Sequence, residues 1–277
     1  MLLLPPNLVY FSGIMTIVSG QKEGKLRQIF KQWPRGTVAA QPWLESQGVY
    51  RQLARTYLRS SWVERVGRGA YKLAGDRVSW TGGLYAIQRH LELPIHAGAR
   101  TALEFQGYAH FLPIGKGTTV WLFGNPGTRL PAWFQSYGWD VRVRYVAMDL
   151  FPANRLAGLT EKDMEGSYSI RLSSPERAMM EVLALVPQES DFEGAQLLME
   201  GLATLRPALV QELLESCRSV KVKRLFMHLA EKSGHPWIEE LDRAKINFGK
   251  GKRVVVAGGR FDSKYGITVP RERQSLL

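Results

Sequence analysis

Cysteine and long apolar runs are scarce in this 277-residue chain. The one cysteine, Cys217, excludes an internal disulfide and a zinc site built from cysteines, and it fits a reducing compartment such as the cytoplasm. No segment approaches the roughly 20 apolar residues that a membrane-spanning helix requires. Pro5 and Pro6 interrupt the apolar start, which carries no basic residues, so we expect neither a signal peptide nor a membrane anchor.

Acidic residues are outnumbered, and the imbalance is uneven along the chain. Aspartate and glutamate total 25 against 37 lysines and arginines, a formal net charge of +12. Residues 22–75 carry eleven basic and three acidic residues, and residues 218–277 carry fourteen and six, so each region is +8. Residues 76–217 carry twelve and sixteen, a charge of −4. The chain therefore has two candidate anion-binding regions, one near each end.

Patterns of catalytic and metal-binding residues are also missing. The five histidines do not fall at metal-ligand spacing with a carboxylate pair. There is no Gly-x-Ser-x-Gly elbow and no cysteine–histidine pairing of the kind that activates a nucleophile. Gly115-Lys116-Gly117-Thr118 departs from a phosphate-binding loop because glycine follows the lysine. We expect a protein that is not an enzyme and holds no cofactor or metal.

The most informative pattern is an arginine at every fourth position. Arg51, Arg55 and Arg59 share one face of a predicted helix, while Leu53, Ala54, Tyr57 and Leu58 fall on the other side. Charged helix faces are most often simply solvated, and that alternative stays open for the arginines taken alone. An arginine-lined helix is nevertheless what recognition of a DNA major groove requires.

The surrounding elements predict a winged helix-turn-helix over residues 22–76. Apolar spacing in residues 25–30 predicts a first helix, and Gln41–Gln47 predicts a second, with Pro42 in its first turn and Gly48 as the turn that follows. Beyond the arginine helix, two strand-like runs in Trp62–Leu73 form a basic hairpin. The expected small core consists of Leu26, Phe30, Leu44, Leu53, Leu58 and Tyr71.

The rest of the chain predicts a larger mixed α/β domain over residues 77–277. Strand patterns at 118–123, 141–146 and 168–172 are followed by helical patterns from Ser174 to about residue 232, and strands return near 253–257 and 265–269. Cys217 falls within a helical pattern, where a small buried apolar side chain is expected. Residues 1–21 form an N-terminal extension that we expect to be flexible. The predicted fold class is α+β.

Several motifs, in this order, resemble the AbiEi-type antitoxins of type IV toxin–antitoxin operons. They are Gly67-Arg68-Gly69-Ala70-Tyr71 in the hairpin, Gly98 to Glu104 with Gly107-Tyr108-Ala109, Ser174-Pro175-Glu176-Arg177-Ala178, Val220 to Phe226, and Gly251 through Gly258-Gly259-Arg260 to Pro270. Together they cover about residues 22 to 270. Each motif also has a plain structural explanation, such as a helix start at Ser174 or the solvated face of a helix at Lys221, Lys223 and Arg224.

This resemblance implies two functions and two partners. The winged helix would bind inverted repeats in its own promoter as double-stranded DNA and repress the operon, and the larger domain would counteract a nucleotidyltransferase-like toxin without requiring a stable complex. We expect DNA contacts from Arg51, Gln52, Arg55 and Arg59 in the major groove and from Arg65, Arg68 and Lys72 on the flanking backbone. The basic C-terminal region predicts an antitoxin surface at Lys221, Lys223, Arg224, Lys252, Arg253 and Arg260. Two alternatives are a ligand-sensing winged-helix transcription factor and a nuclease-like enzyme fused to a winged helix.

Overall fold

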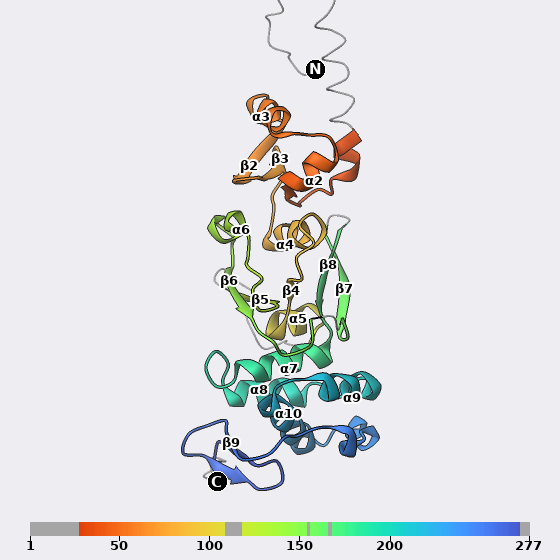
Figure 1. Cartoon of the computed structure of the whole chain (residues 1–277), viewed down its shortest axis with the longest axis vertical. Helices are drawn as coiled ribbons and strands as arrows, with labels where there is room; N and C mark the ends of the chain where they lie inside the picture. Colours follow the sequence, from red (N-terminus) through yellow and green to blue (C-terminus); the bar gives the residue numbers. More distant parts are fainter. Residues whose placement is uncertain (1–27, 109–117, 154–155, 166–167, 272–277) are drawn as a thin grey trace, which may run out of the picture.

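The computed structural model describes residues 28–108, 118–153, 156–165 and 168–271. The molecule is elongated, and α3 and the C-terminal sheet lie at opposite ends of its described part (Figure 1). The predicted N-terminal extension and the loop at Gly115–Gly117 lie outside the described residues. Within the described residues, no helix is long and apolar enough to cross a membrane.

An N-terminal winged helix-turn-helix confirms the predicted fold class. Gly48, with a φ of 73°, makes the turn between the second helix and the arginine helix, and the wing strands pair antiparallel in the order β1-β3-β2. The elements are residues 28–32 of a first helix, β1 (Ala39–Ala40), α2 (Gln41–Ser46), α3 (Arg51–Arg59), β2 (Val63–Gly67) and β3 (Ala70–Leu73).

The small core of the winged helix follows the prediction in part. Leu44 and Tyr71 are buried. The other three predicted residues in the described region are only partly buried and pack at the edge of the cluster: Phe30, Leu53 and Leu58. The centre is filled instead by residues that include Ile29, Trp33, Ala54 and Tyr57. Leu26 lies outside the described residues.

The larger part is built on a five-stranded mixed sheet in the order β6-β5-β4-β8-β7. The pairs β5–β6 and β4–β8 are parallel, and the pairs β4–β5 and β7–β8 are antiparallel. The strands are β4 (His96–Ala97), β5 (Thr119–Gly124), β6 (Arg142–Ala147), β7 (Leu159–Met164) and β8 (Tyr168–Ser173). The helices that accompany them are α4 (Trp80–Arg89), α5 (Ala99–Phe105) and α6 (Ala132–Ser136).

A layer of helices lies beyond the sheet, and its almost wholly buried member α7 lies between α5 and the other helices of the layer. The predicted start of α7 is confirmed, since Ser174 is the N-cap residue and Pro175 the first helical residue. Cys217 is buried as expected. The elements of this layer are α7 (Pro175–Leu185), α8 (Phe192–Glu200), α9 (Pro207–Ser216), α10 (Val220–Ser233) and two short 3₁₀ helices, η1 (Pro236–Glu240) and η2 (Arg243–Lys245).

A three-stranded sheet in the order β10-β11-β9 ends the described chain. Its strands are β9 (Arg253–Val254), β10 (Arg260–Asp262) and β11 (Ile267–Val269). The middle strand packs Ile267 and Val269 into the main core and lies against α10. The two outer strands carry mostly exposed side chains.

The winged helix is seated closely on α4. A Cβ atom added at Gly82 would lie 1.9 Å from the Gly36 carbonyl oxygen, so only glycine permits this approach of the two backbones. The imidazole of His90 stacks on Trp43 with ring centroids 4.5 Å apart. Its Nδ1 atom lies 3.4 Å from the amide of Ala40, which donates to it. Burial lowers the pKa of His90 to about 4, so the ring is neutral at this interface.

Candidate nucleic-acid interface and C-terminal surface

The amphipathic character predicted for the arginine helix is observed in α3. Ala54 and Tyr57 are buried and hold the helix on the small core. The predicted groove residues, Arg51, Gln52, Arg55 and Arg59, are all exposed. An α-helix with its side chains is about 10–12 Å across, so α3 fits a major groove about 12 Å wide.

The arginines of this face are largely uncommitted within the described chain. Arg51 lies 3.9 Å from Glu45, but its side chain remains 80% exposed. Neither Arg55 nor Arg59 forms an ion pair with a described carboxylate. Such exposed guanidinium groups can form bidentate hydrogen bonds to guanine or to phosphate oxygens.

The wing presents two of its three predicted basic residues to solvent. Arg65 and Arg68 are exposed. Lys72 is partly buried; its Nζ atom lies 2.7 Å from the Glu64 carboxylate and donates to the Asp76 carbonyl at 2.9 Å. The hydrogen bond from Lys72, together with the amide of Gly75, lowers the pKa of Glu64. Lys72 is therefore neutralised within the wing, unlike the free backbone contact that the sequence predicts.

Two exposed aromatic residues flank α3, and the sequence reasoning missed both. Tyr50, the N-cap residue, is 67% exposed, and Trp62, just beyond the helix, is 47% exposed. Trp62 contacts Phe30 at a centroid distance of 6.1 Å. The sequence signal that could have indicated them is the position of an aromatic residue at each end of a basic helix, because large exposed aromatic side chains commonly mark binding surfaces.

The prediction that Lys223 and Arg224 belong to an exposed surface is wrong. Each side chain is only 5% exposed. The Arg224 guanidinium donates to the carbonyl oxygens of four residues in the C-terminal segment: Phe248, Gly249, Gly251 and Gly266. Arg224 thereby fastens this segment to α10, because the segment covers the helix face that periodicity alone assigns to solvent.

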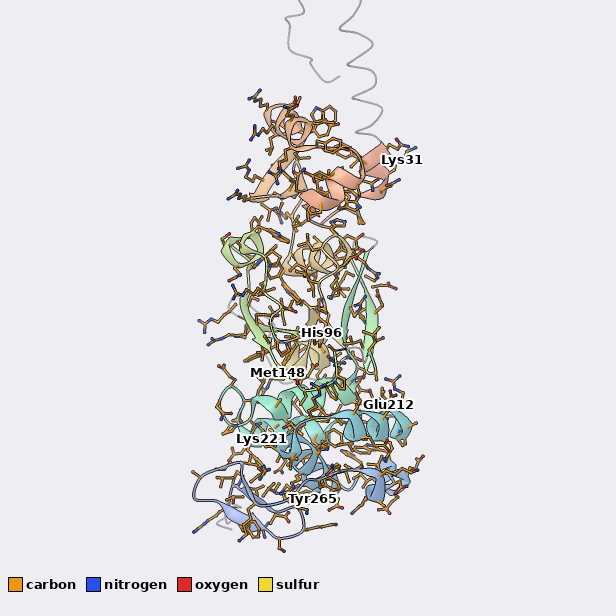
Figure 2. All side chains as sticks on the ribbon, viewed as in Figure 1. Lys31, His96, Met148, Glu212, Lys221 and Tyr265 are labelled. Carbon is orange, nitrogen blue, oxygen red and sulfur yellow. The ribbon has the colours of Figure 1, made fainter. Side chains whose placement is uncertain are left out.

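Lys221 also departs from the exposed role. Its ammonium group donates to the carbonyls of Ala184, at 3.0 Å, and Val186, at 2.5 Å, where α7 ends. Burial lowers the pKa of this lysine. Lys221 lies at the level of the helical layer (Figure 2), where it satisfies carbonyls that have no partner within their own helix.

The other three predicted residues of the antitoxin surface are exposed on the C-terminal sheet: Lys252, Arg253 and Arg260. Two large apolar side chains accompany them, Val254, which is 69% exposed, and Phe261, which is 43% exposed. The Lys252 ammonium lies 4.9 Å from the centre of the Phe261 ring, a cation–π contact. We call these five residues the C-terminal surface.

The two interior motifs, residues 98–104 and 174–178, meet around the buried carboxylate of Glu181. One of its oxygens accepts from the Ala99 amide at 3.0 Å, and the other lies 3.1 Å from Arg177 Nε and 2.9 Å from His96 Nε2. The hydroxyl of Ser173 donates to both oxygens. Burial raises the pKa of Glu181, but His96 and Arg177 outweigh it and lower the pKa overall.

The geometry of this cluster indicates that it stabilises the fold. Glu181 is 2% exposed, and His96 lies in the middle of the molecule (Figure 2). A Cβ atom at Gly98 would approach the Glu181 carboxylate to 2.3 Å. The motif residues therefore join α5, α7 and the central strands around one ionised group, which explains their pattern without a reaction.

Comparisons with known proteins bear on the whole chain. Residues 22–114 match the family model described as the N-terminal domain of the AbiEi antitoxin transcriptional regulator, and residues 117–270 match the model for the transcriptional regulator, AbiEi antitoxin, of type IV toxin–antitoxin systems. The crystal structure of the RV2827C protein from Mycobacterium tuberculosis is similar in fold, with a TM-score of 0.56 and 16% identity over 91% of this chain and 90% of that one. No curated protein shows significant sequence similarity.

Proposed function

The chain belongs to the AbiEi family of transcriptional regulators and antitoxins of type IV toxin–antitoxin systems, and from this premise we propose that it represses its own operon and neutralises the toxin encoded with it. The winged helix binds inverted repeats in the promoter. The C-terminal part counteracts a nucleotidyltransferase-like toxin. The two activities use opposite ends of the elongated molecule.

The observation that carries the DNA-binding proposal is the exposed arginine face of α3 on a winged-helix scaffold. Arg51, Arg55 and Arg59 face solvent without a close ion pair among the described residues. Arg65 and Arg68 extend the positive surface onto the wing. In this arrangement α3 contacts base edges and the wing contacts phosphates, which position the protein without specifying sequence.

The antitoxin proposal rests on the C-terminal surface. Lys252, Arg253 and Arg260 combine exposed positive charge with the apolar side chains of Val254 and Phe261. Mixed aromatic and cationic patches of this kind are typical of partner-binding surfaces. Lys221 and Arg224 are excluded from this proposal because their side chains bind backbone carbonyls within the fold, and Lys223 is excluded because it is buried.

The test removes positive charge from one end of the full-length protein at a time. The groove variant carries Arg51→Gln and Arg55→Gln, and the surface variant carries Lys252→Gln, Arg253→Gln and Arg260→Gln. Each lost base contact should cost roughly 1–3 kcal/mol of operator binding in a mobility-shift titration. With about six phosphates neutralised, the slope of log affinity against log salt should be roughly −5.

Each variant is the control for the other. The groove variant should lose promoter repression but protect cells from the toxin, and the surface variant should do the reverse. Arg68→Ala should weaken all DNA sequences about equally, since the wing contacts phosphates. Unchanged operator affinity in a folded groove variant would remove α3 from the interface, and full protection by the surface variant would remove the C-terminal surface from neutralisation.

A further inference from the structure

An open cleft of about 660 Å³ lies between α6 and the edge strand β6. Its volume falls within the range of small-molecule sites, roughly 300–1,000 Å³. Its lining combines aromatic rings with arginines and contains no acidic residue among the described ones. Its principal polar and aromatic members are Arg129, Gln135, Tyr137, Trp139, Arg144 and Tyr145.

The aromatic rings of the cleft are fixed in position. Trp139 donates from Nε1 to the Phe134 carbonyl at 2.8 Å, and its ring lies 4.5 Å from that of Tyr137, centre to centre. The hydroxyl of Tyr145 donates to the Thr128 carbonyl at 2.8 Å. Trp139, Tyr137 and Tyr145 are each only partly buried. They therefore form a preorganised platform with accessible ring surface.

Two glycines make room for this platform. A Cβ atom at Gly83 of α4 would lie 2.8 Å from the Trp139 indole, and one at Gly124 would lie 2.3 Å from the Tyr145 hydroxyl oxygen. Neither glycine has a positive φ, so backbone conformation does not account for them. Because these glycines have no Cβ, the Trp139 indole and the Tyr145 phenol have space to lie beside the cleft.

The two arginines of the cleft are exposed and uncommitted. Neither Arg129 nor Arg144 forms an ion pair or a hydrogen bond within the part of the chain that the structure describes. The nearest acidic residue in sequence, Asp140, lines a different cleft, beside the β7–β8 hairpin. Free guanidinium groups next to aromatic faces suit a ligand with both an anionic group and a flat ring.

We propose that this cleft binds a free nucleotide, a nucleoside di- or triphosphate. The base stacks on Trp139, as bases do on aromatic side chains in nucleic-acid-binding proteins, and the Tyr137 ring, tilted 55° from the indole, contacts the edge of the base. The phosphates bind to Arg129 and Arg144. Gln135, whose amide nitrogen donates to the Leu130 carbonyl, has its side-chain oxygen available as an acceptor at the rim. This site is separate from α3 and from the C-terminal surface, so it does not depend on the proposed function.

The experiment measures nucleotide binding by the full-length protein. ATP and GTP are titrated by calorimetry at 0.15 M salt, with adenosine, guanosine, inorganic triphosphate and a single-stranded oligonucleotide as separate arms. The wild-type protein should bind a nucleotide saturably and at least about tenfold more tightly than the nucleoside or triphosphate alone, since both halves of the site are required.

The variants locate the site. Arg129→Gln combined with Arg144→Gln, and separately Trp139→Leu, should each weaken binding at least about tenfold. Arg142→Gln is the matched control, because Arg142 is an exposed arginine on the same strand that does not line the cleft; its affinity should stay within about twofold of wild type. Thermal melting identifies any variant that fails to fold. If Trp139→Leu fails to fold, the double arginine variant, which changes only exposed side chains, decides the question.

Several outcomes overturn the proposal. One is the lack of saturable binding of either nucleotide by the wild-type protein. Another is binding that the double arginine variant leaves unchanged, which would place the ligand elsewhere. Triphosphate binding as tight as that of ATP or GTP would reduce the cleft to an anion site. Binding of the oligonucleotide alone would make it a surface for single-stranded nucleic acid instead.

Discussion

Replacing Arg224 with glutamine should destabilise this protein far more than any change on the C-terminal surface. Arg224 donates hydrogen bonds of 2.6–3.2 Å to carbonyl oxygens at four positions between Phe248 and Gly266. Glutamine is too short to reach all of them and has no charge. The change therefore leaves buried carbonyl groups without a donor and releases the segment that they belong to.

The magnitude follows from the type and number of these contacts. A hydrogen bond from a charged donor contributes roughly 1.5–3 kcal/mol net. Four bonds from one guanidinium group are not additive, because a single substitution removes one charge and one desolvation cost. Breaking a buried charged interaction typically costs about 3–5 kcal/mol, and we expect the Arg224→Gln variant to lose about that much unfolding free energy. Arg253→Gln, an exposed control, should stay within about 0.5 kcal/mol of wild type.

Two measurements check this expectation. Urea denaturation compares the unfolding free energies of wild type, Arg224→Gln and Arg253→Gln. Limited proteolysis with mapping of the first cleavage sites should show early cuts within residues 246–270 in the Arg224 variant alone. If both variants unfold within about 1 kcal/mol of each other and resist the protease equally, Arg224 does not anchor the segment and the reasoning fails.

Three further predictions follow from buried groups. The pKa of His90 is lowered to about 4 in the folded protein, so as the pH falls the unfolded chain is protonated at this histidine before the folded one. The contribution of His90 to stability is therefore complete above about pH 6.5 and is lost as the pH falls toward 4. Thermal melting should show that on the order of 2 kcal/mol is lost by pH 5, and an unchanged pH profile in His90→Phe would contradict this. Gly82→Ala should lower the melting temperature by several degrees, because its Cβ meets the Gly36 carbonyl, whereas Gly138→Ala, with nothing nearby, should not; equal melting temperatures would refute the close seating. Burial raises the pKa of Cys217 to about 11, so a thiol reagent should label it slowly at pH 7.5 until urea unfolds the protein, and rapid native labelling would disprove that burial.

The winged helix was predictable because its signals are local. The four-residue arginine spacing, Pro42 at a helix start, and the glycines around Arg68 each act within a few residues, and the structure confirms the elements that they predict. β4 and β7 were missed for physical reasons. β4 has only two residues, and β7, at the sheet edge, is exposed along most of its length and therefore lacks apolar alternation.

The functional surfaces were less predictable because they depend on distant segments. Val220–Phe226 has the spacing of a half-solvated helix, and nothing within it indicates that residues 248–266 cover Arg224. The cleft beside β6 could not be predicted for the same reason, since its residues come from the loops on both sides of α6, from α6 itself and from β6, and acquire meaning only together. When a segment distant in sequence covers a helix face, the hydrophobic periodicity of that helix does not reveal it.

The close seating of the winged helix on α4 has a consequence for how an occupied promoter is organised. When a DNA-binding domain is joined to the rest of a protein by a flexible linker, the attached domain can take any orientation around the duplex. Here the contacts at Gly82 and His90 leave no such freedom. If α3 binds the operator as proposed, the C-terminal surface projects from the DNA at a fixed angle and height. On a promoter with two half-sites, inserting five base pairs between them would then rotate one bound chain by about half a helical turn relative to the other.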